Sequence, residues 1–346
     1  MRSERKKIKI RDRLVGEGYP TLVIAEIGNN HDGKVSQAKK LIKDAYEAGC
    51  DIVKFQTHIA YEEMIDDGAT PPHFKEPRYK FTQRMQLSKK DHIILKKYAE
   101  NLGLIFLSSP FSEKAVDLLE EIGVSAFKIA SGELTNIPFL HYVAKKKKTI
   151  IMSTGMSSWE EIDRAVSAIR KYNNKLILMQ CTSQYPCPYE KVGLGVIWAL
   201  KKRYDCPVGI SDHTPTNYTA FAAVTLGACI IEKHFTIDKS LYGPDHKASL
   251  VKEEMRSLIE GVRAIETALK PFDKNTLRSL GAVRDTFQKS LVAKRDIPAH
   301  TKITRTFICQ KKPGTGISPV LIDTIVGKVS RVKIRKNTLL HINQFK

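Results

Sequence analysis

The sequence predicts a closed (β/α)8, or TIM, barrel followed by a small second domain. An apolar strand followed by an amphipathic helix recurs eight times between residues 21 and 269. The strands are almost continuously apolar, which is typical of a parallel sheet covered on both faces. The alternation then stops after Lys270, where the composition changes.

The first strand is expected at 21–30. The helix after it has Ala38, Leu41 and Ala45 on one face, and Gly49 ends it. Between the second and third strands we expect a long polar loop through Lys90 and then a helix. The other strands are expected at 51–57, 104–111, 126–133, 149–156, 175–183, 207–214 and 229–236, and a last helix at about 250–269.

An open, doubly wound sheet is the alternative architecture. It is less consistent with the sequence, because no glycine-rich phosphate loop follows the first strand. We therefore assign 1–280 to the barrel domain, with a linker at 270–288. Residues 285–346 form a separate small domain, predicted from the short β-like runs SLVAKRDI and SRVKIR and from Pro-Gly at 313–314.

The composition is that of an ordinary globular enzyme, with 42% hydrophobic and 27% charged residues. No run reaches the roughly 18 apolar residues of a membrane helix. The start MRSERKKIKIRDRL has no apolar core of a signal peptide, so we expect a cytoplasmic protein. The six cysteines form no CxxC pair, and we interpret them as reduced, mostly structural thiols.

The net charge of +20 raises the question of a nucleic-acid partner. Half of it lies between Asp285 and Lys346, where 13 residues are basic and 3 are acidic. These basic residues alternate with apolar ones, and no nucleic-acid motif accompanies them. We therefore predict a solvated basic surface that creates a positive field for an anionic substrate, with neither nucleic acid nor membrane as partner.

Two histidines follow neighbouring strands near the end of the barrel. His213 and His234 come at the ends of apolar runs, and parallel strands bring such ends to the same rim. A single histidine there is more often a hydrogen-bonded structural residue. Two at adjacent strand ends indicate a divalent metal site.

Lys54 and Lys128 lie within apolar strands, where an unpaired charge is costly. Either a buried ion pair, such as Lys54 with Glu26, or an anionic ligand must compensate them. Two such lysines together favour a ligand, and nearby hydroxyls and carboxylates suit a phosphate and acid–base chemistry. The serines could instead satisfy only loop amides. The polar residues at the strand ends are Glu26, Gln56, Ser109, Ser131, Glu133, Ser153, Ser183, Tyr185, Ser211 and Asp245.

The motifs IAEIGNNHDG, VKFQT, FKIASGE, STGM, GISDHT and EKHFT resemble those of the sialic acid synthase family over almost the whole chain. The tail, with AKRDIPAHTKIT and KKPGTGI, resembles the family's antifreeze-like domain of β-clip type. The resemblance implies a domain-swapped homodimer in which this domain reaches over the partner's barrel. It also implies a transferase that joins phosphoenolpyruvate to an open-chain N-acylated hexosamine, releasing phosphate and a nine-carbon 2-keto acid.

The resemblance also implies residue roles. His213 and His234 would hold Mn²⁺ or Mg²⁺, and Glu26, Glu133 and Asp245 would be the catalytic carboxylates. Gln56, Tyr185, Glu133 and Asp245 would touch the sugar. Phosphoenolpyruvate would be held by Lys54, Ser109, Lys128, Ser131, Ser153, Ser183 and Ser211.

The chain departs from the family pattern at three positions. Ser183 replaces the usual Asn and Ser109 a common Thr, and both keep a hydrogen-bonding group. Lys312 replaces the Arg expected to reach the partner's sugar, and it lacks the bidentate fork of arginine. This puts the contact with the acyl group in question.

The sugar itself depends on the loop 58–90, which we expect to line its pocket. N-acetylmannosamine is the default substrate. A 2,4-diacetamido-trideoxyhexose, leading to legionaminic or pseudaminic acid, is the alternative. An inactive barrel that binds sugars or polyanions is the alternative from a different class, and the intact set of lysines, carboxylates and histidines argues against it.

Overall fold

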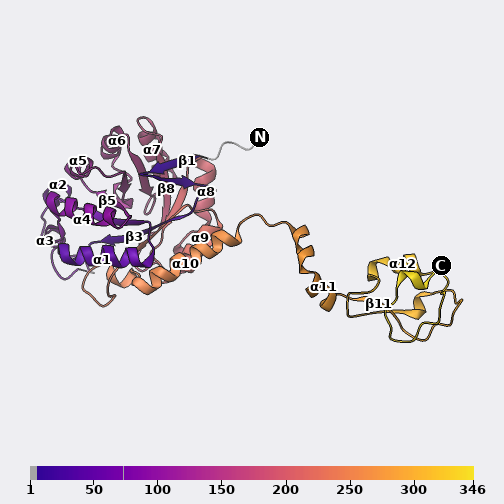
Figure 1. The fold of residues 1–346 in the computed structure, drawn as a ribbon. Coiled ribbons are helices and arrows are strands. Elements are labelled where there is room, and N and C mark those ends of the chain that lie inside the picture. Colours follow the sequence, from indigo (N-terminus) through magenta and orange to yellow (C-terminus); the bar gives the residue numbers. More distant parts are fainter. Residues whose placement is uncertain (1–5, 73) are drawn as a thin grey trace. The chain divides into compact units, whose positions relative to one another are not determined.

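The computed structural model describes residues 6–72 and 74–346, apart from the side chains of 277–279. The chain forms two compact units that divide between Lys270 and Pro271 (Figure 1). Within the described residues, no helix is long and apolar enough to cross a membrane.

The first unit is a parallel eight-stranded barrel, as predicted. Strand β3 pairs with both β4 and β10, so the first and last barrel strands meet. Among the described residues no ladder joins β5 to β6, although the two strands lie against each other, so the barrel is nearly closed. The strands are β3 (Leu22–Gly28), β4 (Ile52–Thr57), β5 (Ile105–Pro110), β6 (Ala126–Ile129), β7 (Thr149–Ser153), β8 (Leu176–Cys181), β9 (Val208–Ser211) and β10 (Ile230–His234).

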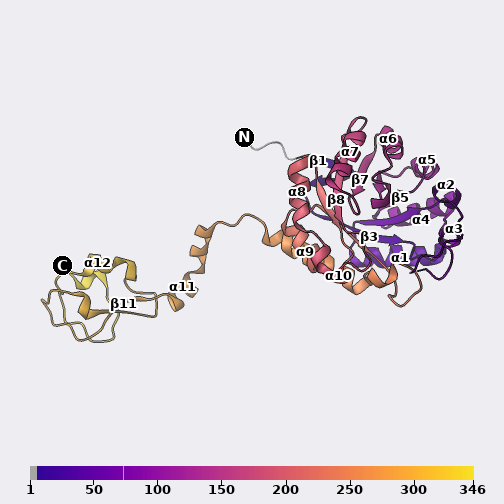
Figure 2. The same ribbon diagram turned by 180° about the vertical axis from the view of Figure 1, so that it is seen from behind.

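Helices surround these strands in both views (Figures 1 and 2). Their ends follow local sequence signals: Ser88 and Asp91 form a capping box on α4, and Gly49 ends α1 in the left-handed conformation. The outer helices are α1 (Val35–Ala48), α4 (Lys89–Asn101), α5 (Glu113–Glu121), α6 (Ile137–Lys145), α7 (Trp159–Arg170), α8 (Gly195–Tyr204), α9 (Tyr218–Thr225) and α10 (Lys252–Ala268).

The loop predicted through Lys90 is more ordered than expected. It contains two short helices, α2 (Ala60–Glu63) and α3 (Arg78–Met85), before α4 begins. Phe81 and Met85 are buried on α3, so tertiary packing stabilises a segment whose polar composition suggested a loop.

The segment before the barrel also forms an element that the sequence analysis did not predict. Strands β1 (Lys7–Ile10) and β2 (Arg13–Gly16) make an antiparallel hairpin. Ile8 and Ile10 pack with the apolar side chains of the barrel interior, and Thr149 at the start of β7 donates a hydrogen bond to Lys9 O at 2.7 Å. The hairpin covers the amino ends of the strands and leaves the carboxyl ends for a site.

The second unit has its own small core, which includes Leu291, Ile303 and Phe345. Its regular elements are α11 (Gly281–Phe287), β11 (Ser290–Ala293), β12 (Ile308–Lys311) and α12 (Ile322–Ile325), and β11 pairs with β12. The run SRVKIR contributes isolated bridges rather than a strand. The expected linker at 270–288 contains α11 and a 3-10 segment, Lys274–Leu280. The domain limits at 280 and 285 stay predictions.

Candidate active site

Four ionisable side chains meet at the carboxyl ends of the barrel strands. Lys54 on β4 lies between two carboxylates, with its Nζ 2.6 Å from Glu26 Oε2 and 3.7 Å from Glu232 Oε2. Lys128 on β6 has its Nζ 3.2 Å from Glu232 Oε1. All four residues are between 1% and 4% exposed. The Lys54–Glu26 pair considered in the sequence analysis is therefore present, within a larger charged cluster.

The pKa values of the two carboxylates differ strongly. Burial raises the pKa of Glu26 to about 7, against the opposing effect of Lys54. Burial also acts on Glu232, but Lys128 and Lys54 outweigh it and lower the pKa of Glu232 to about 2. Near neutral pH, Glu232 is therefore charged while Glu26 is partly protonated. When Glu26 holds a proton, two lysines face one carboxylate, and the cluster can accept an anion.

Three buried serines bond to this cluster from the intervening strands. Ser109 on β5 accepts a hydrogen bond from Lys54 Nζ at 3.1 Å, and Ser153 on β7 accepts one from Lys128 Nζ at 2.8 Å. Ser211 on β9 donates to a carboxylate oxygen of the cluster at 2.8 Å. The three hydroxyls line the same buried space as the lysines.

A second group of hydroxyls lies around Gly155, after β7. Ser131 Oγ accepts from Gly155 N at 3.1 Å and lies 3.5 Å from Cys181 Sγ. A Cβ at Gly155 would come within 2.5 Å of Ser183 Oγ and 2.7 Å of Ser131 Oγ. A side chain at this position would therefore displace both hydroxyls, and glycine is what allows their close approach.

The two histidines face each other, with ring centroids 5.3 Å apart. His213 Nδ1 donates to Thr182 O at 2.9 Å, because a carbonyl only accepts, and His213 Nε2 lies 3.4 Å from Ser211 Oγ. Burial opposes the charge on His213, but Cys181 outweighs it and raises the pKa of His213. Burial, together with His213, holds the pKa of His234 well below its usual range, so that ring is neutral. The ring of Tyr185 packs 4.1 Å from that of His213 and 5.5 Å from that of His234.

These two imidazoles have the chemistry that a divalent cation requires. His234 Nδ1 is buried without a hydrogen-bond partner in the described residues, and Asp245 Oδ2 lies 3.8 Å from it. With His213 deprotonated, the two imidazoles and the nearby carboxylate would fit a divalent cation such as Mn²⁺ when water and substrate complete the coordination. Across 6–72 and 74–346, no group of three or more His, Cys, Asp or Glu side chains forms a metal cage by itself.

Comparison with known proteins identifies the family. Residues 41–274 match the NeuB family, and residues 288–346 match the SAF domain. The first match spans more than half of the chain. The chain belongs to the NeuB family. The resemblance found in the motifs is confirmed, and so is the barrel followed by an antifreeze-like domain.

The relatives are named as synthases of different sugar acids. N,N'-diacetyllegionaminic acid synthases from Legionella pneumophila and Campylobacter jejuni are 37% and 39% identical, over 98% and 92% of this chain and 98% of each of their own. Human N-acetylneuraminate-9-phosphate synthase is 35% identical over 94% of this chain and 92% of its own. The N-acetylneuraminic acid synthetase structure from Leptospira borgpetersenii, in complex with citrate, has a TM-score of 0.75 at 30% identity and covers 83% of this chain and 99% of that one.

In this NeuB-family chain, the remaining predicted residues on the β3 side converge around Gly28. Gln56 Nε2 donates to Glu26 Oε1 at 3.3 Å. Gly28 lies at a bulge in β3 with φ +51°, and a Cβ there would come 3.3 Å from both Glu26 Oε1 and Asp245 Oδ2. Glu26, Gln56 and Asp245 therefore border one small space beside the histidines.

Two predicted residues are not joined to this arrangement. Glu133 is partly buried on the turn after β6 and accepts a hydrogen bond from Asn136 at 3.2 Å; within the described residues, no hydrogen bond or ion pair connects it to the other predicted site residues. Lys312 belongs to the second unit, where its Nζ lies 5.0 Å from the centre of the Phe287 ring. The roles of both residues stay predictions.

The sequence analysis missed three residues. Glu232 is two positions before His234, so strand alternation puts both on one face, and this signal could have identified it. Cys181, interpreted as structural, lies beside Ser131 and Ser183. His58 lies 3.1 Å from Gln56 Oε1 through its Nε2, but its place in a polar loop gave no signal.

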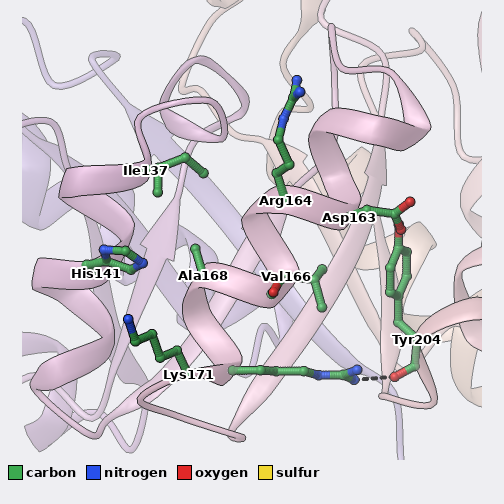
Figure 3. A pocket seen from close by; sticks show the side chains of 10 residues that line it. Ile137, His141, Asp163, Arg164, Val166, Ala168, Lys171 and Tyr204 are labelled. Carbon is green, nitrogen blue, oxygen red and sulfur yellow. Dashed lines mark hydrogen bonds between the residues drawn. The ribbon is translucent and has the colours of Figure 1, made fainter.

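A cavity of about 990 Å³ lies elsewhere, on the outside of the barrel between α6, α7 and α8 (Figure 3). Ile137, His141, Arg164 and Tyr204 are among its lining residues. None of the predicted site residues lines it. The charged cluster, rather than this outer hollow, is therefore the candidate active site.

Proposed function

We propose that this chain is a nonulosonic acid synthase, which condenses phosphoenolpyruvate with the open-chain form of an N-acylated hexosamine. The products are phosphate and a nine-carbon 2-keto acid. The observation that supports this most is the pair of buried lysines, which contact serines and carboxylates at the carboxyl ends of the barrel strands. The relatives of this chain are named as sugar acid synthases.

In this proposal the lysines and hydroxyls hold the phosphate and carboxylate of phosphoenolpyruvate. Lys54 and Lys128 supply charge, and burial strengthens their attraction for an anion. Hydroxyls on both sides of the lysines can turn their protons toward the ligand oxygens. Those hydroxyls belong to Ser109, Ser131, Ser153, Ser183 and Ser211.

His213 and His234 would hold Mn²⁺ or Mg²⁺, which when bound supplies Lewis-acid polarisation of the sugar aldehyde. Gln56, Tyr185 and Asp245 border the same space and would orient the sugar. C3 of phosphoenolpyruvate forms the new bond to the aldehyde carbon. Water then adds at C2, and loss of phosphate leaves the keto group.

The protons of these steps require carboxylates with suitable affinity. Because the pKa of Glu26 is raised to about 7, Glu26 can both accept and release a proton near neutral pH. Asp245, which also lies next to Gly28, is the second candidate, and burial raises its pKa as well. Glu133 is the third candidate.

Two sugars are the candidate substrates. The names of the relatives support a 2,4-diacetamido-trideoxyhexose, leading to legionaminic acid, at least as well as N-acetylmannosamine. The test is phosphate release from phosphoenolpyruvate with a panel containing both sugars, followed by product mass. We expect release only when phosphoenolpyruvate and an accepted sugar are both present. No release with any amino sugar, with Mn²⁺ supplied, would contradict the proposal.

Assembly is part of the proposal. We expect a cytoplasmic homodimer in which Lys312 of one subunit approaches the sugar in the other. Lys312→Ala should then raise the Michaelis constant for the sugar by roughly tenfold, the effect of losing one charged hydrogen bond. The constant for phosphoenolpyruvate should stay the same, and Lys312→Arg should be tolerated. Equal sugar kinetics for Lys312→Ala and wild type would exclude Lys312 from the site.

A further inference from the structure

A buried ion pair lies directly beside the two histidines in the sequence. Asp212 precedes His213, and Lys233 precedes His234. Lys233 Nζ lies 3.1 Å from Asp212 Oδ2, and both side chains are 0% exposed. The pair thus joins β9 to β10 where each strand presents its histidine.

The ammonium group of Lys233 has no unused donor. A lysine has three N–H groups, and Nζ has three near acceptors, Asp212 Oδ2 at 3.1 Å, Thr214 O at 2.7 Å and Thr216 O at 2.8 Å, with Thr214 Oγ1 further away at 3.4 Å. Asp212 and Thr214 flank His213. One cation therefore ties both neighbours of His213 to the residue before His234.

The pair lies on the other face of the strand from the candidate site. Lys233 alternates with Glu232 and His234, so its side chain points away from the charged cluster. Thr219 at the start of α9 donates to Asp212 Oδ2, and the Asp212 amide donates to Glu232 O at 2.9 Å. The pair is held from the helix side and does not touch the space for substrate.

Tyr185 packs against both imidazole rings, but few hydrogen bonds hold the rings themselves. His213 Nδ1 is held by Thr182 O, whereas His234 Nδ1 has no hydrogen-bond partner in the part of the chain that the structure describes. The distance between the rings therefore depends on the backbone of residues 212–214 and 233–234 as well as on the packing of Tyr185. That backbone is what the ion pair holds.

We propose that Asp212 and Lys233 are positioning residues that set the spacing of His213 and His234 for a divalent cation. This inference rests on the metal part of the proposed function. The competing explanation is a pair that serves only folding. Removing one partner of a buried pair is strongly destabilising in either case, whereas removing both can be nearly neutral for stability.

The test is direct Mn²⁺ binding, measured by calorimetry and by electron paramagnetic resonance of free Mn²⁺, on the wild type and on folded variants. The variants are Lys233→Met, Asp212→Asn and the double variant. Asp212→Asn keeps the shape and the acceptor for the Thr214 amide. We expect Mn²⁺ affinity to fall roughly 10–100-fold in Lys233→Met and in the double variant, as for other residues that orient metal ligands.

Asp51→Asn is the matched control. Asp51 accepts bonds from the Val23 amide and from Arg263 at the amino ends of the strands, so its loss should lower stability and leave Mn²⁺ affinity unchanged. Wild-type Mn²⁺ affinity in the double variant would overturn the inference. Failure of the double variant to fold would also overturn it, because the pair would then be a folding requirement. If the wild type itself binds no Mn²⁺, the metal part of the proposed function fails, and the measurement distinguishes the two failures.

Discussion

Lys54 and Lys128 carry the same charge at similar depth, but their surroundings differ. Burial opposes the charge on Lys54, yet Glu232 and Glu26 outweigh it and raise the pKa of Lys54. For Lys128 burial prevails and lowers the pKa, because among the described residues Glu232 alone lies within ion-pair distance and Lys54 repels the charge. Lys54 therefore contributes to both the fold and the proposed anion site, and a test of its binding role must separate the two.

Lys54→Met should weaken phosphoenolpyruvate binding by roughly 10–100-fold, from the loss of one charged contact. It should also lower stability by about 3–5 kcal/mol, since it leaves buried carboxylates without their partner. Adding Glu26→Gln should restore much of the stability while binding stays weak. Calorimetric binding and urea denaturation measure the two effects. Full binding by both variants would make Lys54 structural only, and Lys89→Met on α4 is the surface control.

The buried His31 should make the unfolding free energy depend on pH. It is fully buried, and burial lowers the pKa of His31 to about 3, while Nδ1 accepts from the Gly33 amide at 3.0 Å. Below the unfolded pKa of about 6.5, the unfolded chain binds a proton that the folded chain does not. The unfolding free energy should therefore fall as pH decreases.

Between pH 8 and pH 5, His31 should account for about 2 kcal/mol of this loss. His31→Phe should not show this part of the loss. The gap in unfolding free energy between variant and wild type should therefore differ by about 2 kcal/mol between pH 8 and pH 5. Urea denaturation at the two pH values measures it. A difference independent of pH would mean that His31 is protonated in the folded chain.

The sequence was sufficient to predict site residues that stand out by type. Lysines in apolar strands and histidines at adjacent strand ends are unusual, and the structure places them together. Glu232 was not assigned to the site because it lies within an apolar run, before the polar end of its strand. Cys181 was missed because nothing in its sequence surroundings distinguishes a thiol in the core from one beside serines. Contacts of that kind depend on which strands become neighbours.

At the scale of elements, the eight barrel strands were predictable because both their faces are buried, which makes each a continuous apolar run. The hairpin β1–β2 and helix α3 were not predicted. Lys7–Ile10 alternates between exposed and buried residues, but it becomes a strand only by pairing with β2 and packing under the barrel. Helix α3 has a mostly polar sequence, and its burial of Phe81 and Met85 depends on distant contacts.

The loop after β7 offers a substitution with a matched control. Gly155→Ala puts a methyl group where Ser131 and Ser183 place their hydroxyls, so these side chains must turn away. We expect phosphoenolpyruvate affinity to fall roughly tenfold, about one hydrogen bond, with little change in stability. Gly132→Ala, next to Ser131 with open space around its Cβ position, should bind as the wild type does. If Gly155→Ala and Gly132→Ala both bound phosphoenolpyruvate as tightly as the wild type, these serines would lie outside the anion site.

At the scale of the whole molecule, the charge of +20 should attract an anionic substrate over a distance. Salt shortens that distance, because the Debye length falls from about 30 Å at 0.01 M to about 8 Å at 0.15 M. The Michaelis constant for phosphoenolpyruvate should therefore rise several-fold from 10 mM to 300 mM NaCl. The constant for the uncharged sugar should stay within about twofold. Equal salt dependence for both substrates would contradict long-range attraction.

The hairpin under the barrel has a consequence for synthesis on the ribosome. Lys9 bonds to Thr149, which is 140 residues further along the chain. At about 5–20 residues per second, that partner follows roughly 7–30 seconds after the hairpin has been made. During this time Ile8 and Ile10 have no barrel interior to enter. Chaperones that bind exposed apolar segments are suited to shield it, and a bulky fusion placed before Lys7 should lower the yield of folded protein more than one placed after Lys346.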